Sequence, residues 1–356
     1  MEILPPEVTA VRRPWDGDQL RLHRWLRQRP GLLPPGARLL LAVSGGQDSM
    51  AMTALLRDLQ PLYGWELRLW HGDHGWRPEA MAQAWALGAW AARQGLDCVQ
   101  DRAEPGHVPS EAAARRWRYA CLERQAQALG CSHVLTGHTA SDRAETVLLN
   151  LARGCHLQGL ASLRECRPLL PSEAASPSLV RPLLLFDRAD TARICRQRQL
   201  PVWVDASNDD LRLARNRIRA ELLPLLEQLH PGAGRRISQQ AARLADQLDH
   251  QHALQDLALT ALSRTVPPPD QALDQRALAA LPAATRRDLL QRWLQRWTGR
   301  SPSAAVLDGL CRRLGQGGGR GRHDLGAGWR LHWAASTLNL SPLASPHGGL
   351  GRDDPD

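Results

Sequence analysis

An apolar strand that turns directly into a glycine-rich loop constrains this chain more than any other feature. Residues 39–43 are all apolar, and residues 44–49 follow as Ser-Gly-Gly-Gln-Asp-Ser. The adjacent Gly45 and Gly46 let the backbone approach an anion closely, and a helix beginning near Ser49 directs its free N–H groups at the same point. The stretch therefore predicts a strand, a pyrophosphate-binding loop and a helix, in that order.

The loop also carries a carboxylate, at Asp48. A carboxylate beside a polyphosphate is repelled unless a divalent cation bridges the two, so we expect Mg²⁺ to bind together with the nucleotide. The loop is not a Walker loop, because that loop needs Gly-Lys-Ser/Thr and none of the 356 residues is lysine. We expect a nucleotide at the whole loop: Ser44, Gly45, Gly46, Gln47, Asp48 and Ser49. An ordinary strand-to-helix turn is the alternative interpretation.

Strands and helices alternate through the first part of the chain, which favours an α/β fold with a doubly wound parallel sheet. The four expected strands are 38–43, 66–71, 97–101 and 133–136. Ligands of such sheets bind at the carboxyl ends of the strands, where the glycine-rich loop, His74, Gly137 and His138 all fall. We expect these residues to contribute to one nucleotide-binding crevice.

Composition limits the class of protein. The net charge is +9, and all 45 basic residues are arginine, which favours a polyanionic partner. Seven scattered cysteines without a Cys-x-x-Cys pair indicate reduced thiols. The chain begins without the pattern of a signal peptide, and no apolar run approaches about 18 residues. These features predict a cytoplasmic protein that does not bind a membrane.

The run His-Pro-Gly-Ala-Gly at 230–234 predicts a domain boundary. We expect an N-terminal domain over 1–231 and a smaller, mainly helical domain over 235–340 with a glycine-rich hairpin at 317–328. Residues 341–356 are rich in Pro, Gly and Asp and predict a disordered tail.

Two further clusters place charged residues near the crevice. On a helix, Glu111 and Arg115 share one face, and so do Arg115 and Tyr119; taken alone, this is also the pattern of a solvated, salt-bridged surface. Asp142 and Glu145 lie three residues apart at the start of the next helix. The helix dipole alone would favour carboxylates there, whereas a functional interpretation is metal binding or the positioning of an amine.

The clusters above and several further segments occur in the order and spacing of a known family. By these motifs the chain resembles the tRNA(Ile)-lysidine synthetase family, within the PP-loop ATP pyrophosphatase group. The resemblance covers most of residues 38–231, whereas the C-terminal part resembles the family only in length and position. Besides the clusters above, it depends on residues 153–154, 159–160, 181–183, 205–208, 215–219 and 223–224.

The resemblance implies a two-step reaction. ATP adenylates C2 of the wobble cytidine, position 34, of the isoleucine tRNA with a CAU anticodon. Free L-lysine then displaces AMP, which gives lysidine, AMP and diphosphate. By the same resemblance Asp48, Arg115 and Glu145 are catalytic, and Asp48 and Asp142 hold Mg²⁺.

A basic helical region from about 211 to 229 is expected to face the tRNA through four arginines: Arg212, Arg215, Arg217 and Arg219. Arg215 and Arg219 lie on one side of that helix, and a solvated basic helix is the alternative interpretation. A homodimer is left open.

The third cluster departs from the family's usual pattern, because Thr139 and Ser141 stand where His and Asp are usual, and Arg143 stands where Gln is usual. The departure weakens the expectation of activity more than that of the fold. Two other functions stay open. A tRNA thiolase of the same group would need a catalytic cysteine pair, which the missing Cys-x-x-Cys argues against. A catalytically decayed tRNA-binding protein would bind tRNA without converting ATP to AMP.

Overall fold

A computed structural model describes two compact units, residues Met1–Ala245 and Asp246–Asp356, and the division between them falls inside helix α10 (Ala233–Ser263). The segment 205–208 and the tail beyond residue 343 lie outside the described residues. Described are residues 15–75, 80–104, 108, 110–170, 176–203, 211–263, 272–315, 319–326, 328–334 and 336–343.

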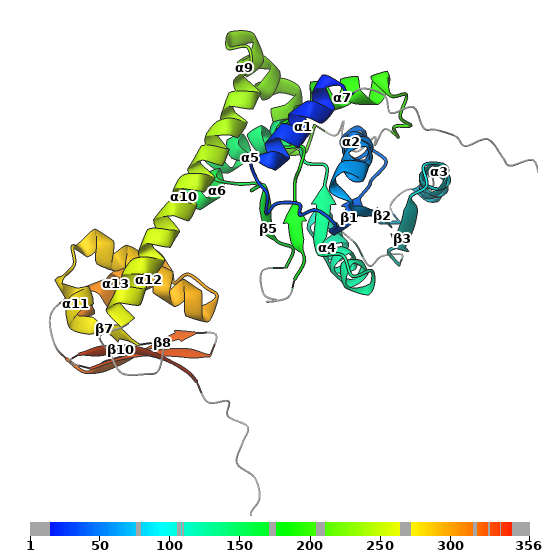
Figure 1. Ribbon diagram of the computed structural model, residues 1–356. Helices are drawn as coiled ribbons and strands as arrows, with labels where there is room; N and C mark the ends of the chain where they lie inside the picture. The colour runs from blue at the N-terminus through cyan, green and yellow to red at the C-terminus, as the bar shows by residue number, and fades with distance from the viewer. Residues whose placement is uncertain are drawn as a thin grey trace, which may run out of the picture. The chain divides into compact units, whose positions relative to one another are not determined.

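The first unit is built on a six-stranded, mostly parallel sheet with the strand order β3-β2-β1-β4-β6-β5 (Figure 1). Only the edge strand β5 runs antiparallel to its neighbour. The four strands expected from the sequence are confirmed, and the α/β fold class with them. The strands are β1 (Arg38–Ala42), β2 (Glu66–Asp73), β3 (Asp97–Arg102), β4 (His133–Thr136), β5 (Cys166–Pro168) and β6 (Ser178–Val180).

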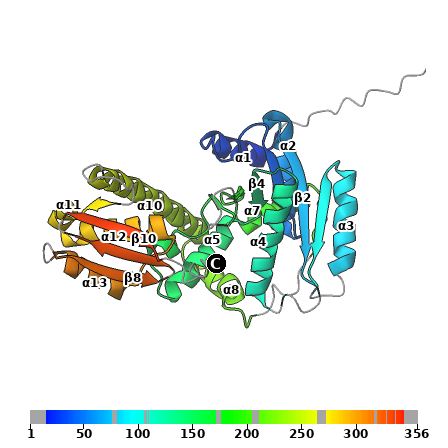
Figure 2. The same cartoon turned by 90° about the horizontal axis from the view of Figure 1, so that it is seen from below.

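Helices cover both faces of this sheet. Successive side chains of the central strand β1 point to opposite faces, so each face has its own apolar residues to bury. Leu39 and Leu41 of β1 pack into one hydrophobic cluster, and Leu40 packs into the other; all three are fully buried. The first cluster receives side chains from α1 (Gly17–Arg27), α2 (Gln47–Tyr63), α3 (Ala80–Arg93) and α7 (Arg188–Gln197). The second receives them from α4 (Glu111–Ala128). Figure 2 shows α3 and α4 beside the sheet.

Two helices follow β4 in the chain: α5 (Ala140–Ala152) and the short α6 (Leu157–Leu160). The basic region predicted at 211–229 is helical but not uniform. It consists of α8 (Ala214–Arg217), a π-helical turn η2 (Ile218–Leu222) and α9 (Leu223–Leu229). π-Helical turns are rare and occur often at functional sites, and this one packs against α5.

The second unit combines the C-terminal half of α10 and three further described helices with a four-stranded antiparallel sheet of order β7-β10-β9-β8. The expected hairpin corresponds to β8 and β9. The prediction of a mainly helical unit was incomplete, because it did not include the antiparallel sheet. Strand β10 was not expected, although its buried Leu338 and Leu340 alternate with polar residues, and its last residues reach into the segment 341–356 predicted as a tail. The elements are β7 (Leu273–Asp274), α11 (Gln275–Ala280), α12 (Ala283–Thr298), α13 (Ala304–Gly315), β8 (Gly321–Gly326), β9 (Trp329–Trp333) and β10 (Thr337–Pro342).

Two expectations drawn from the composition concern the cysteines and the helices that could span a membrane. All seven cysteines are free thiols, and Cys121, Cys131 and Cys195 are buried. Over the described ranges, no helix combines the length and the apolar character that a bilayer span requires.

Candidate functional site

The glycine-rich loop follows β1 as expected and leaves the start of α2 uncapped by any side chain. Gly45 has a φ of +82°, which an L side chain rarely adopts, and Gly46 is the N-cap residue. Ser44 Oγ accepts the Gly46 N–H at 3.2 Å and lies 3.3 Å from Ser49 Oγ. The loop thus presents a helix N-terminus and two hydroxyls at the carboxyl end of the central strand, which suits a phosphate chain.

Close backbone approaches fix this loop in place. A Cβ atom on Gly137, just after β4, would lie 2.9 Å from the backbone nitrogen of Ser49, so only glycine lets the two segments meet. A Cβ atom on Gly45 would lie 2.8 Å from the indole ring of Trp203, and the backbone N–H of Trp203 donates to the Gly45 carbonyl at 3.0 Å. Gly137, predicted as a nucleotide-binding residue, therefore shapes the loop through its missing side chain.

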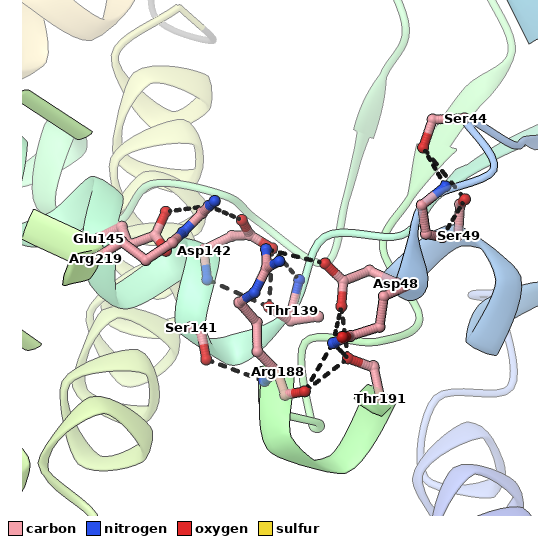
Figure 3. A network of polar contacts seen from close by, with 12 residues as sticks. Ser44, Asp48, Ser49, Thr139, Ser141, Asp142, Glu145, Arg188, Thr191 and Arg219 are labelled. Carbon is pink, nitrogen blue, oxygen red and sulfur yellow. Dashed lines mark hydrogen bonds and ion pairs between the residues drawn. The ribbon is translucent and has the colours of Figure 1, made fainter. Parts of the chain in front are cut away.

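Asp48 points away from the loop toward the N-terminus of α7 (Figure 3). Its Oδ1 accepts the Thr191 hydroxyl at 2.5 Å, and its Oδ2 lies 3.4 Å from Arg188 Nη1. Burial raises the pKa of Asp48, the nearby Asp142 carboxylate raises it further, and Arg188 opposes both. Because the Asp142 carboxylate disfavours the ionised form of Asp48, a cation bound beside them would stabilise Asp48 in its charged form.

Asp142 is held in the first turn of α5 by a reciprocal capping box with Thr139. Its Oδ2 accepts both the backbone N–H and the hydroxyl of Thr139 at 2.8 Å, and its Oδ1 accepts Arg215 Nη2 at 3.0 Å. Burial alone would raise the pKa of Asp142, but these hydrogen bonds and the Arg215 charge hold it below its usual value. Thr139, which departs from the family pattern, thus orients the carboxylate.

Glu145 is fully buried and lies at the centre of an ion-pair cluster (Figure 3). Arg219 donates to both of its oxygens, from Nε at 2.7 Å and from Nη2 at 2.9 Å, and Arg215 Nε donates at 2.8 Å. The sequence predicts Arg215 and Arg219 on a surface facing tRNA. Their guanidinium groups instead point inward, because two buried carboxylates on α5 need cationic partners.

The other two arginines of that region lie at the surface. Arg217 is exposed and pairs with Glu221 at 2.9 Å, and Arg212 is exposed in the turn before α8. The basic region thus divides into an inward pair and an outward pair.

Two histidines flank the crevice. His138 follows β4, and its Nδ1 lies 2.9 Å from the Thr136 hydroxyl. Burial lowers the pKa of His138 to about 3, although the Asp142 carboxylate acts in the opposite direction, so the ring is neutral near pH 7. His74 follows β2, lies edge-on to Trp117, and its Nε2 is 3.3 Å from Arg118 Nη2.

The remaining predicted catalytic residue, Arg115, lies on α4 with its guanidinium 4.9 Å from the centre of the Tyr119 ring. Its charge also lowers the pKa of His138. Within the described ranges, no group of three or more His, Cys, Asp or Glu side chains forms a metal cage. Mg²⁺ commonly uses one or two carboxylates with phosphate oxygens and water, and Asp48 with Asp142 fits that requirement.

Helix α7 contributes to the site in a way that the sequence did not indicate. Gln47 Nε2 donates to the Arg188 carbonyl and to the Thr191 hydroxyl, both at 2.8 Å, so this loop residue anchors α7. The Arg188 N–H donates to Ser141 Oγ at 3.2 Å, which ties α7 to α5. The capping box at the start of α7, Asp187 with Asp190, was a readable helix-start signal, but not a sign of contact with Asp48.

Comparison with known proteins agrees with this geometry. Residues 19–226 match the family model of a PP-loop domain, and residues 273–338 match that of a TilS substrate binding domain. The chain is 48% identical to a tRNA(Ile)-lysidine synthase of Parasynechococcus marenigrum over 94% of this chain and 96% of the relative. It is 40% identical to that of Prochlorococcus marinus, over 93% and 98%.

Among solved structures, the U34-tRNA thiolase NcsA of Methanococcus maripaludis with its [4Fe-4S] cluster has a similar fold. The TM-score is 0.53 at 18% identity, covering 64% of this chain and 79% of that one. This likeness concerns the fold alone.

Proposed function

The chain belongs to the tRNA(Ile)-lysidine synthase family and has its ATP-dependent, lysidine-forming ligase activity, and we propose how its residues divide that reaction. The PP-loop domain implies ATP binding, and the second matched domain implies tRNA(Ile) as substrate. Lysine is the other substrate, as the enzyme's name says. This assignment of residues to the two steps depends on the ion-pair cluster around Glu145. The cluster offers a buried carboxylate for an amine at a place other than the phosphate-binding loop.

The first step, adenylation of the wobble cytidine, is assigned to the loop after β1. Its N–H groups and the Ser44 and Ser49 hydroxyls would hold the phosphates of ATP and stabilise the charge on the leaving diphosphate. Asp48 and Asp142 would hold Mg²⁺, which supplies charge neutralisation when bound. Arg115 would contact the RNA at the target base from α4.

The second step, attack by lysine, is assigned to Glu145. Its buried carboxylate is an attractive site for an ammonium group, but Arg215 and Arg219 occupy both of its oxygens. Lysine therefore has to exchange with one of these arginines, and Arg215 can retain its second partner, Asp142, when it does so. This exchange would keep the amine site closed to water until lysine arrives.

Contact with tRNA is assigned to the outward arginines of the basic region, Arg212 and Arg217. Arg215 and Arg219 act instead as positioning residues for the carboxylates. Exposed arginines bind the RNA backbone without reading its sequence, so this surface would contribute affinity rather than identity.

The test follows the two half-reactions separately. Diphosphate release from ATP is measured with unmodified CAU isoleucine tRNA, with and without lysine, and lysine incorporation into the tRNA is measured in parallel. We expect diphosphate release to require the tRNA and to begin without lysine. Release that depends on lysine but not on tRNA would contradict the proposed order.

Glu145→Gln should separate the two steps. The amide preserves the volume but removes the charge, so lysine incorporation should fall about a hundredfold or more, the range of a lost acid–base or positioning group, while lysine-independent diphosphate release continues. Glu123→Gln is the matched control, since Glu123 is also buried but, among the described residues, accepts hydrogen bonds from Gln127 and Ser176 and has no arginine partner. Equal lysine incorporation by both variants would remove Glu145 from the amine site.

A further inference from the structure

Three arginines gather around one tyrosine at the side of the crevice. Arg115 and Arg167 place their guanidinium carbons 4.9 and 5.3 Å from the centre of the Tyr119 ring. Arg181 follows β6 directly and interacts electrostatically with Tyr119, Arg115 and Arg167. The four side chains come from α4, from β5 and from the end of β6, so only the fold brings them together.

This arginine cluster combines a buried positive charge at Arg181 with a half-buried one at Arg167 and an exposed one at Arg115. Arg181 is only 2% exposed, donates from Nη1 to the Arg164 carbonyl at 2.6 Å, and has no hydrogen-bond partner at Nε among the described residues. In the part of the chain that the structure describes, no carboxylate oxygen lies within 4.0 Å of a guanidinium nitrogen of Arg115, Arg167 or Arg181. By contrast, each carboxylate at the Glu145 cluster has an arginine partner.

The pKa values reflect the same excess. Burial lowers the pKa of Arg181 to about 10, and the charges of Arg167 and Arg115 act in the same direction. Burial would raise the pKa of Tyr119, but Arg115, Arg181 and Arg167 together hold it below its ordinary value. A buried guanidinium group with two like charges beside it is unfavourable unless an anion binds among them.

The position of the cluster separates it from the phosphate loop. Arg181 lies at the carboxyl end of β6, which is two strands away from β1 in the sheet. At about 4.8 Å between neighbouring strands, the backbones that carry the two sites are about 10 Å apart. Arg115 and Arg181 both lower the pKa of His138, which follows the intervening strand β4.

We propose that Arg115, Arg167 and Arg181, arranged around Tyr119, form a second anion subsite that binds a phosphodiester of the RNA beside the target base. The proposal rests on the proposed function, which places ATP at the loop after β1. The RNA strand that carries the target base has a phosphate on either side of that base, so a phosphodiester enters the crevice together with the base. A phosphodiester offers two charged oxygens, which suits guanidinium donors.

Arg167→Gln tests the subsite, because glutamine removes the guanidinium charge and keeps an amide donor on the side that faces the Pro168 and Leu169 carbonyls. Arg181 is a poorer choice, since its replacement leaves a buried polar gap. Arg93→Gln is the matched control: Arg93 is exposed in the last turn of α3, which packs on β3 at the other edge of the sheet. Binding of unmodified CAU isoleucine tRNA is measured over a series of salt concentrations, and binding of MgATP is measured separately.

For Arg167→Gln we expect the tRNA Kd to rise about tenfold and the slope of log Kd against log salt to fall by about one. MgATP binding should stay within about twofold of the parent, Arg93→Gln should behave as the parent, and Arg167→Lys should restore the salt slope. Unchanged tRNA binding by Arg167→Gln would overturn the proposal. A loss of MgATP binding would also overturn it, because the subsite would then serve the nucleotide.

These measurements read binding and not turnover. Failure of the subsite is therefore distinguishable from failure of the proposed function, which would appear as missing diphosphate release in the parent protein.

Discussion

The phosphate loop after β1 and the carboxylate cluster on α5 lie in the same crevice but are built in opposite ways. The loop is made of backbone: Gly45, Gly46 and Gly137 remove side chains so that N–H groups are presented without obstruction. The cluster is made of side chains: Asp142 and Glu145 are buried and held by arginines from a different segment, α8 and η2.

The difference teaches where each site obtains its specificity. A backbone site recognises any phosphate chain that fits its curvature, and it changes little when bound. An ion-pair site has to exchange partners when a ligand enters, so it discriminates by charge and position. Asp48 links the two sites electrostatically, because it belongs to the loop and the Asp142 carboxylate raises its pKa. The following variants act on Asp48 at the junction, on the loop and on His138 between β4 and α5, from the largest expected effect to the smallest.

Asp48→Asn should have the largest effect, because it removes the charge that joins the two sites while the amide oxygen still accepts the Thr191 hydroxyl. We expect diphosphate release from ATP to fall about a thousandfold, the range of a lost electrostatic group in the transition state. Asp97→Asn is the control, since Asp97 is largely exposed at the start of β3. Normal turnover by Asp48→Asn would break the link between the loop and the cluster.

Gly137→Ala should disturb the loop alone. The added methyl group meets the backbone of Asp48 and Ser49, which cannot move aside as a flexible side chain would. We expect a loss of about 1–3 kcal/mol in the free energy of unfolding and weaker MgATP binding. Gly31→Ala is the matched control, because a Cβ atom on Gly31 would meet nothing within 4 Å. Equal stability of the two variants would show that the contact between β4 and the loop is dispensable.

His138→Asn should change the pH dependence of stability. The folded protein binds a proton at His138 only near pH 3, whereas the unfolded chain binds it near pH 6.5. The contribution of His138 to the free energy of unfolding is therefore fully present above pH 6.5 and is lost as the pH falls toward 3. One such group contributes at most about 1.4 kcal/mol per pH unit. Denaturant unfolding between pH 7 and 4 should give a shallower decline for the variant. Identical slopes for both proteins would mean that His138 is not a buried neutral group.

Local patterns were enough to predict much of the first unit. Apolar runs bounded by turn residues located β1 to β4, and the order Ser-Gly-Gly-x-Asp-Ser located the loop, because both are properties of neighbouring residues. The second unit was harder, since β10 pairs on one side with β7, where Leu338 faces Leu273. These two residues lie 65 positions apart in the sequence, and no local pattern indicates such a pairing.

The candidate site divides in the same manner. Asp142 at the start of a helix was readable, and so was the face shared by Arg115 and Tyr119. The contacts of Asp48 with Thr191 and of Glu145 with Arg219 join residues 143 and 74 positions apart, and no local pattern indicates such pairs. The direction in which Arg215 and Arg219 point depends on those distant carboxylates.

The sequence by itself determined that a glycine-rich loop would follow the first strand, because backbone freedom and helix-end geometry depend only on adjacent residues. It also determined the family, through motifs kept in order along the chain. Only the tertiary structure decided which arginines neutralise the buried carboxylates and which remain clustered around Tyr119. The physical reason is that a buried charge is stabilised or not by whatever the fold places within a few ångströms of it.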